Sequence, residues 1–531
     1  MDVSVIFATH NRQDVLEDVF EAWRKVDKVT KYSYEIICSD DESTDRTIDI
    51  IEQVQDLPVK LIKNKKGGAS KARNAALEVA SGKIIIFTGD DIFPSENYIN
   101  AHYENYLKYG ENVATLGRID WHPDIALNHL MQHITEIGCE QFGFIGLPAY
   151  QMIDFRHFYT SNISVPSSLL HSLNRYFNTD FDKYGFEDIE LGYRLQKAGM
   201  KIYYDPDIRA FHHHIYDSVE KFCNRQISSG EELVVFSHMH DDLEDKCICD
   251  VENCTDAFKK YKKKHTGAGA ARGVFLAHSM NVAKRLTRRL EKKIQKKDRS
   301  LYRGVCSFIY AALFRFSFYY GIALRIAQEN NFNSNNAQII DFAYLYMQKP
   351  FHEIYWNTGK GFNENEARKW VCWDDTQVSI KHQLPEGVEE IRIAPLKDFC
   401  TANVGKIAFI LNDGKEEPAE IEWHNACRVE EDFYDFTHTD DTCILIKKIP
   451  ENYKAIMVEM RVSSMKKHDN AFKMIRHALG AIYRKVRYKT ENSKEWEMQY
   501  AYGQRRRIQI GILGNFDEET RKKVIEDYQK Q

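Results

Sequence analysis

The stretch Ile84-Ile85-Ile86-Phe87-Thr88-Gly89-Asp90-Asp91 decides how this chain folds. Its apolar half, rich in β-branched residues, is typical of a strand buried in a parallel sheet, and the two acids follow at the point where that strand ends. Open α/β sheets bind their ligands at the carboxyl ends of the strands. A pair of carboxylates in that position suits a divalent cation, which prefers oxygen ligands.

Three further short apolar runs precede this strand, at residues 3–7, 34–38 and 59–62. Amphipathic stretches typical of helices follow them, at residues 14–26, 44–55 and 70–80. This alternation indicates βαβ units, so the sequence predicts an α/β domain. The loops after the first two runs, residues 8–12 and 39–45, are polar, and a parallel sheet would bring them to the same edge as the acid pair.

A second acidic segment, Gly185-Phe186-Glu187-Asp188, opens a helical pattern further along the chain. Acids are favoured at helix N-termini by the helix dipole, which is one explanation for them. The other is chemical, because a carboxylate within reach of a hydroxyl can act as its general base. Both can hold at once, and we expect Asp188 to be the base and Glu187 to orient the molecule that carries the hydroxyl.

Taken in order, these segments resemble a known family. Residues 3–12, 39–45, 68–74, 88–94 and 185–195 are similar to the successive signatures of glycosyltransferase family 2, the inverting enzymes with the GT-A fold. The resemblance covers about residues 1–240. It implies a Rossmann-like mixed sheet with helices on both faces, a nucleotide-sugar donor (a UDP-sugar), and a glycan or lipid-linked glycan as acceptor.

The resemblance also implies roles for single residues. The donor-binding positions are Thr9, Asn11, Arg12, Asp41, Gly68, Arg73 and Asp90, with Asp41 on the uracil ring. Asp91 and His212 match the ligands of a divalent metal, Mn²⁺ or Mg²⁺, and His214 is the main rival to His212. Asp188 matches the acid that deprotonates the acceptor, with Glu187 beside it. Because Ser43 or Thr44 fits the cap of the next helix better, we expect the Asp41 side chain to be free.

Gly89 departs from the family pattern, which usually has the first metal-binding acid at this position. Two alternatives stay open: a transferase whose metal site is shifted or weakened, and a non-catalytic glycan-binding or scaffolding protein whose transferase domain has decayed. A nucleotidyltransferase on a similar sheet is a third. It would need a phosphate loop rich in Gly, Arg and Lys after the first strand, and residues 8–12 are not such a loop.

The chain has 531 residues, too many for a single core. We expect a transferase domain at residues 1–240, a helical connecting region at 241–345, a β-sandwich at 346–465 and a C-terminal helical segment at 466–531. The net charge of −5 gives no drive toward nucleic acid. Met1-Asp2 leads directly into a strand and the eleven cysteines are scattered, so we expect a reduced, cytoplasmic setting. Cys247, Cys249 and Cys254 lack a fourth ligand at zinc spacing.

Residues 284–303 hold ten Lys and Arg against two acids, and an apolar run at 304–324 follows them. The run is long enough for a bilayer, but Arg315 lies in its middle, where a charge is costly. Three readings are open for residues 284–324: peripheral contact with an anionic membrane surface, a helical hairpin packed on the catalytic domain, and a true membrane span.

Aromatic residues suggest two sugar contacts. Trp121 and residues 142–150 lie where an acceptor sugar could stack, although such residues are more often part of a core. In the sandwich, Trp356, Trp370, Trp373 and Trp423 are compatible with a glycan-binding module, and equally with a structural or dimerisation domain. The sequence as a whole predicts a metal-dependent inverting glycosyltransferase for a surface glycan such as capsule, O-antigen or wall polymer, peripheral to the inner face of the cell membrane and able to form a homo-oligomer.

Overall fold

The computed structural model describes residues 1–138, 140–144, 147–240, 251–264, 268–347, 351–359, 361–362, 366–371, 377–396, 400–436 and 441–464. It contains two compact units, Met1–Asp241 with Leu276–Asn333, and Asp242–Phe275 with Ser334–Gln531. The predicted helical segment 466–531, Cys247 and Cys249 lie outside the described residues. The four predicted domains and their bounds stay a prediction.

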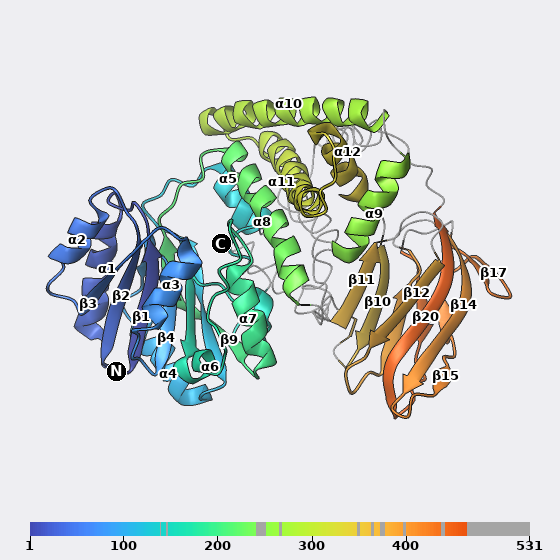
Figure 1. The fold of residues 1–531 in the computed structure, drawn as a ribbon, viewed down its shortest axis with the longest axis horizontal. Coiled ribbons are helices and arrows are strands. Elements are labelled where there is room, and N and C mark those ends of the chain that lie inside the picture. Colours follow the sequence, from blue (N-terminus) through green and yellow to red (C-terminus); the bar gives the residue numbers. More distant parts are fainter. Residues whose placement is uncertain are drawn as a thin grey trace. The chain divides into compact units, whose positions relative to one another are not determined.

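The first unit is built on a mixed sheet whose described strands run in the order β3-β2-β1-β4-β8-β6-β9-β5, with β7 paired to β9 (Figure 1). The first four strands are parallel, as predicted, and each is followed by a helix or a polar loop. Their bounds are β1 Val3–Thr9, α1 Leu16–Val29, β2 Tyr34–Asp41, α2 Thr47–Gln53, β3 Val59–Asn64, α3 Ala69–Leu77 and β4 Ile84–Thr88. The expected α/β fold is thus confirmed.

The second half of the sheet contains elements that the sequence pattern did not reveal. Strand β6 runs parallel to β9, while β8 lies antiparallel between β4 and β6. Short β-branched runs are ambiguous by periodicity alone, which explains why β6 was missed. The bounds are β5 Ile92–Pro94, α4 Tyr98–Tyr109, β6 Val113–Trp121, α5 His129–Gln132 with a π-helical turn at His133–Ile137, β7 Met152–Ile153, a 3₁₀ turn at Phe155–His157, β8 Asn162–Pro166, α6 Ser167–His171, α7 Glu187–Lys197 and β9 Lys201–His212.

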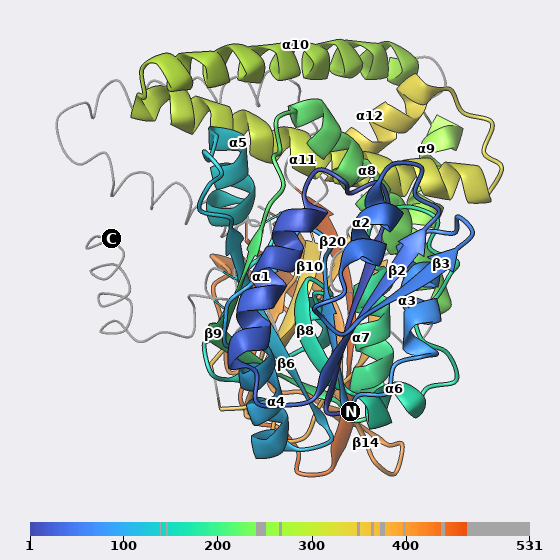
Figure 2. The same cartoon turned by 90° about the vertical axis from the view of Figure 1, so that its left-hand side faces the viewer.

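Helix α8 (Val219–Met239) packs closely against α11 (Ser300–Glu329). Two glycines allow this approach: a Cβ on Gly230 would lie 2.1 Å from the Phe318 carbonyl oxygen, and one on Gly321 would lie 2.0 Å from that of Ile227. Helix α10 (Ala268–Lys296) runs beside α11 in both views (Figures 1 and 2). Apolar residues of α5, α8, α10 and α11 form one cluster, which includes Phe222, Ile294 and Tyr310.

This packing bears on the apolar run 304–324. Helix α11 is the one described helix that is long and apolar enough to cross a bilayer, yet 56% of its most apolar stretch is buried in the protein. Leu313, Phe314 and Ile322 are among its buried residues. Of the three readings, the packed hairpin agrees with the observed burial of α11.

The second unit contains helices α9 (Val251–Lys264) and α12 (Asn336–Met347) and two antiparallel sheets. The described strands of one sheet run β11-β10-β13-β19-β16, and those of the other run β12-β20-β14-β18-β17, with β15 beside β14. Ile391, Ile444 and Val458 belong to the core of the predicted β-sandwich. The bounds are β10 Phe351–Asn357, β11 Ala367–Val371, β12 Gln377–Gln383, β13 Glu390–Ala394, β14 Cys400–Leu411, β15 Glu416–Pro418, β16 Trp423–His424, β17 Arg428–Glu430, β18 Phe433–Asp435, β19 Ile444–Ile446 and β20 Tyr453–Ser464.

The tryptophans of the sandwich differ in exposure. Trp356 packs against the core and its ring lies 4.7 Å from that of His382. Trp423 is 53% exposed on β16, a strand with one described neighbour. The side chain of Trp370 and all of Trp373 lie outside the described residues. Trp423 is therefore the described sandwich tryptophan that is available to a ligand.

Candidate active site

Loops from β1 and β2 are tied together at the carboxyl edge of the sheet. Asn11 has a positive φ of 53°, its backbone N–H donates to the Ser43 hydroxyl at 2.9 Å, and its side-chain oxygen accepts the Thr44 N–H at 2.8 Å. Thr9, at the end of β1, is 2% exposed. Asn tolerates the left-handed region better than most residues, which suits it to this turn. The result is a single polar rim made by two loops that are distant in sequence.

Asp90 and Asp91 are buried at this rim, each 7% exposed. Arg12 joins them: its Nε lies 3.0 Å from an Asp90 oxygen and its Nη2 lies 3.1 Å from an Asp91 oxygen. Burial, followed by the charge of Asp91, raises the pKa of Asp90. Burial also opposes ionisation of Asp91, but His212 and Arg12 outweigh it and hold the pKa of Asp91 below its usual range. One guanidinium thus faces two carboxylates. A cation would relieve the local excess of negative charge that remains.

His212 completes this cluster from the far end of β9. Its Nε2 lies 3.4 Å from Asp91 Oδ2, and β5 brings Ile92 into register with it. The imidazole is packed between rings: the Trp121 ring stacks on it at 5.5 Å, and the Phe142 ring meets it edge-on at 5.2 Å. Of the two readings left open for Trp121 and Phe142, acceptor contact and packing, the observed contacts with His212 agree with packing.

A divalent cation fits the Asp91–His212 pair in its donor chemistry. Oxygen and imidazole donors suit Mn²⁺, and Mg²⁺ commonly takes few protein carboxylates and completes its shell with substrate phosphates. Within the described chain, no group of three or more His, Cys, Asp or Glu side chains is arranged to hold a metal. Water and the phosphate oxygens of a bound diphosphate could complete the shell of a cation here.

The presence of glycine at position 89 has a steric explanation. A Cβ at this position would lie 2.9 Å from the Ile92 side chain and 3.1 Å from an Asp91 carboxylate oxygen. A side chain therefore does not fit unless the neighbouring residues shift. The departure from the family pattern is thus built into the local packing, and the acids that face Arg12 are Asp90 and Asp91.

Asp41 is not free, contrary to the expectation. Its two carboxylate oxygens accept the backbone N–H groups of Gly67 at 2.7 Å and Gly68 at 2.9 Å. Gly68 has φ +84° and directly precedes α3. Asp41 thereby holds the loop that enters α3, and its remaining lone pairs are the ones that a ligand could use.

The second acidic segment forms a strained turn. Gly185 has φ +119° and Phe186 has φ +67°, a left-handed conformation that costs a non-glycine residue about 1–2 kcal/mol. The Phe186 ring is buried and stacks on Phe236 of α8 at 5.8 Å, which holds the turn. Helix α7 begins at the next residue, so Glu187 and Asp188 occupy its first turn.

The two acids of this turn have different surroundings. Glu187 is paired with Arg73, whose Nη1 lies 3.5 Å away and whose guanidinium lies 5.3 Å from the centre of the Phe177 ring. Arg73, expected over the base and phosphates of the donor, thus reaches across to the other acidic segment. Burial, followed by the charge of Glu187, raises the pKa of Asp188 to about 7, against the opposing charge of Arg73. Asp188 is suited to accept a proton near neutral pH.

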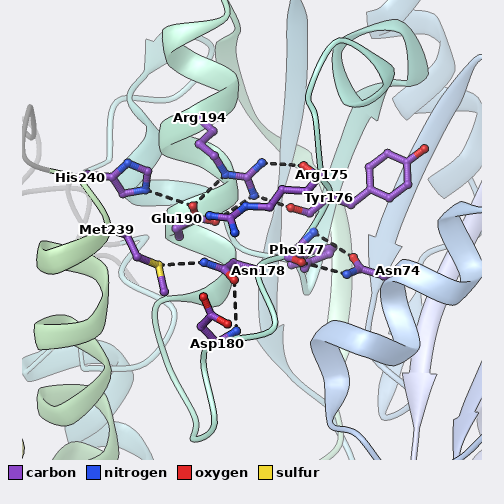
Figure 3. A network of polar contacts seen from close by, with 10 residues as sticks. All are labelled: Asn74, Arg175, Tyr176, Phe177, Asn178, Asp180, Glu190, Arg194, Met239 and His240. Carbon is purple, nitrogen blue, oxygen red and sulfur yellow. Dashed lines mark hydrogen bonds and ion pairs between the residues drawn. The ribbon is translucent and has the colours of Figure 1, made fainter.

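A polar network joins α7 to residues 175–177 (Figure 3). Glu190 is fully buried, and Arg194 binds its two oxygens at 2.8 and 2.9 Å while donating to the Arg175 carbonyl at 2.7 Å. Asn74 holds the Phe177 backbone through bonds of 2.8 and 2.9 Å. Segment 175–177 is thereby fastened to both α7 and α3, which places Phe177 under Arg73.

A cavity of about 420 Å³ lies beside this network, lined by Ser172, Leu173, Asn174, Arg175, Arg194, Lys197 and His240. It contains none of the predicted site residues. Arg194 and Lys197 belong to the last turn of α7, where cations are favoured by the helix dipole. Their presence therefore has a structural explanation.

Residues that the sequence did not single out connect the two acidic clusters. Arg225 of α8 donates to the Tyr216 hydroxyl at 2.7 Å and to the Gln141 side chain at 2.8 Å, and its guanidinium lies 3.7 Å from the centre of the Tyr184 ring. The Tyr216 ring lies 4.7 Å from His214, which stacks on His212 at 5.6 Å. A continuous chain of contacts thus runs from Asp91 to Tyr184, four residues before Asp188. No motif marks Arg225, so only its contacts reveal it.

The chain is similar to known proteins. Residues 4–170 match the family described as Glycosyl transferase family 2. A "dolichyl N-acetyl-alpha-D-glucosaminyl phosphate 3-beta-D-2,3-diacetamido-2,3-dideoxy-beta-D-glucuronosyltransferase" of Methanococcus voltae is 24% identical over 239 residues, 43% of this chain and 71% of the relative. A "UDP-Glc:alpha-D-GlcNAc-diphosphoundecaprenol beta-1,3-glucosyltransferase WfaP" of Escherichia coli is 40% identical over 90 residues, 17% of this chain and 35% of the relative.

Other relatives share only part of their length with this chain. The shared stretch covers 48% of a validoxylamine A glucosyltransferase of Streptomyces hygroscopicus subsp. limoneus. Among solved structures, S. aureus TarS 1-349 aligns with 68% of this chain and 96% of its own, at 15% identity and a TM-score of 0.35. Four of the five ordered motifs lie in the matched region, and the fifth, residues 185–195, follows it. Residues 4–170 of this chain are therefore similar to glycosyl transferase family 2.

Proposed function

We propose that the chain is a metal-dependent inverting glycosyltransferase. The observation that carries this proposal is the pairing of two kinds of site in one compact unit. Asp91 and His212 offer donors for a cation, and Asp188, with a pKa raised to about 7, stands on a strained turn joined to them by ring and guanidinium contacts. A binding scaffold would have no need of a carboxylate tuned in this way.

The donor in this proposal is a UDP-sugar. Asp41, Gly68, Asn11 and Thr9 would line the nucleotide, and the lone pairs left on Asp41 are suited to the N–H of a uracil ring. Arg12, beside Asp90, would share the phosphate charge with the cation. A divalent ion bound to Asp91 and His212 would supply Lewis-acid stabilisation to the departing diphosphate. The relative whose name begins with UDP-Glc supports this choice of nucleotide.

The transfer step needs a single base. The acceptor oxygen forms a bond to the anomeric carbon, the bond from that carbon to the diphosphate breaks with its electron pair leaving on the diphosphate, and the acceptor proton passes to Asp188. Attack from the face opposite the leaving group inverts the anomeric carbon. Glu187, held by Arg73, would orient the acceptor rather than take its proton.

Tyr184 is proposed as the acceptor platform. Its ring is 50% exposed, and the Arg225 guanidinium lies 3.7 Å from its centre. Burial is the largest cause of the raised pKa of its hydroxyl, and the charges of Glu187 and Asp188 add to it, as expected for a ring close to the base. A sugar ring could stack on the exposed side of such an anchored aromatic. Tyr184 is preferred over Trp121 and Phe142 in this role because the rings of those two residues pack on His212.

The biological acceptor is proposed to be a glycan or lipid-linked glycan of a surface polysaccharide, made in the cytoplasm or at the inner face of the membrane. The names of the Methanococcus and Escherichia relatives, which mention dolichyl phosphate and diphosphoundecaprenol, support a lipid-linked acceptor. For the β-sandwich, glycan binding through Trp423 and self-association remain part of the proposal.

The test is release of UDP from a panel of UDP-sugars with Mn²⁺, without acceptor. We expect hydrolysis of one donor by the native chain, its loss on chelation, and strong loss in Asp188→Asn. Asp18→Asn is the matched control, because Asp18 also lies in the first turn of a helix and is exposed. The scaffold alternative predicts no turnover in any of these proteins, even where a donor binds in a thermal-shift assay.

A further inference from the structure

Helix α10 buries one side and exposes the other. Thr287, Leu290 and Ile294 are buried, and Leu290 and Ile294 pack in the cluster that includes Tyr310 of α11. The rotation of an α-helix puts Arg285, Arg289, Lys292 and Lys296 on the opposite side, with Val282 and Leu286 along one flank of it. All six side chains are exposed. We call them the α10 outer face.

Two acids that lie on or against α10 contact residues other than the cations of the α10 outer face. Glu291 is directed inward, where it accepts the Tyr310 hydroxyl at 2.5 Å, and Glu220 is paired with Arg288 at 3.1 Å. Within the described residues, Arg285, Arg289, Lys292 and Lys296 have no carboxylate partner. In a chain with a net charge of −5, this surface is a local exception that needs an external anion.

The aliphatic residues on this face are also unusual. Of the sixteen large apolar side chains exposed in the described chain, five lie between residues 274 and 301: Val274, Phe275, Val282, Leu286 and Leu301. Val282 is 48% exposed and Leu286 is 42% exposed, both beside the unpaired cations. Single exposed apolar residues are ordinary, but a row of them beside cations is typical of helices that lie at a membrane surface.

We propose that the α10 outer face binds the surface of an anionic lipid bilayer. The four cations would meet headgroup phosphates, and Val282 and Leu286 would enter the boundary with the acyl chains. Nucleic acid fits less well, because its phosphate backbone offers no contact for two aliphatic side chains. In this proposal the two halves of residues 284–324 have different roles. Helix α10 contacts lipid, whereas α11 is buried inside the protein. It does not depend on the transfer reaction.

The test uses the full chain and co-sedimentation with vesicles of phosphatidylcholine alone or with about 30% phosphatidylglycerol at low salt. We expect the chain to bind only the anionic vesicles. This binding should be lost at about 0.5 M salt, where the attraction between charges is strongly screened. Each neutralised cation should weaken partitioning about fivefold, so Arg285→Gln/Arg289→Gln should weaken it by about 25-fold. Lys25→Gln/Lys28→Gln, on the exposed side of α1, is the control with the same change of net charge.

Four results would overturn the proposal. They are no binding to anionic vesicles at low salt, equal binding by the α10 and α1 charge variants, unchanged binding by Val282→Ser/Leu286→Ser, and preferential binding of a duplex oligonucleotide that vesicles cannot displace. Circular dichroism and donor hydrolysis serve as checks that each variant is folded. Because lipid binding is measured without donor or acceptor, its failure would leave the proposed transferase activity untouched, and the reverse also holds.

Discussion

Replacing Glu187 with Gln should move the acidic limb of the rate profile to lower pH by about one unit. The base must be ionised to accept a proton, so activity falls as pH drops through the pKa of Asp188. That pKa rises from 3.8 to about 7, with burial as the largest cause and the charge of Glu187 as the next. A carboxylate at roughly 6 Å and an effective dielectric of about 40 contributes ~1.4 kcal/mol, or about one pKa unit. Removing that charge lowers the pKa of Asp188 by this amount.

Arg73→Gln should move the same limb in the opposite direction. The Arg73 guanidinium lowers the pKa of Asp188 and pairs with Glu187 at 3.5 Å, so its loss leaves both carboxylates less compensated. Opposite signs from two neighbouring substitutions are difficult to obtain through general damage to the fold. The pair of variants therefore tests the electrostatics of Asp188 rather than the stability of α7.

The assay is kcat/KM for UDP release from about pH 5 to pH 9, which reports the pKa of the free enzyme's base. Asp18→Asn should leave the limb in place. The reasoning is refuted if both variants move the limb in the same direction, if Glu187→Gln leaves it unmoved, or if Asp188→Asn retains it.

Further predictions concern stability, acceptor binding and the metal site. Because the pKa of Asp188 is raised in the folded state, the stability of the chain falls as pH rises from about 4 to about 7. Asp188→Asn should therefore raise the free energy of unfolding at pH 8 by about 1–2 kcal/mol after allowing for solvent screening, and its melting temperature should be higher than that of the native chain. Tyr184→Ala should lower the ratio of transfer to donor hydrolysis about tenfold for a saccharide acceptor, while Tyr184→Phe keeps the stacking ring and most of that ratio. Gly89→Asp restores the family's usual acid but should lower both the melting temperature and the Mn²⁺ response of hydrolysis, since its Cβ meets Ile92 at 2.9 Å. Gly321→Val should destabilise the chain by about 3 kcal/mol in denaturant titrations, because its side chain would meet the Ile227 carbonyl oxygen at 2.0 Å.

Local pattern was enough to predict much of the fold. The apolar runs that became β1 to β4 alternate with amphipathic helices, and this alternation depends on residues that are near each other in sequence. The same holds for the start of α7 at Glu187. By contrast, β6 and α4 were not predicted, because their sequences carry no distinctive period or turn signal.

Which side chains meet across the sheet could be decided only by tertiary structure. Asp41 looked free until the loop before α3 folded back onto it, and the pairing of Arg73 with Glu187 became visible only in the tertiary structure. These contacts depend on how far apart two loops lie in space, and no local pattern records that distance.

The sequence by itself determined the order of strands and helices in the first half of the domain, the edge of the sheet that holds the acids, and the choice of Asp91, His212 and Asp188 as candidates. Tertiary structure decided which cation pairs with which acid, the link through Arg225 and Tyr184, and the burial of α11 beneath an exposed basic helix. The physical reason is how far apart in sequence the interacting residues lie. Strand and helix formation follow from neighbouring residues, whereas pKa values, ion pairs and exposure depend on charges and surfaces brought together from distant parts of the chain.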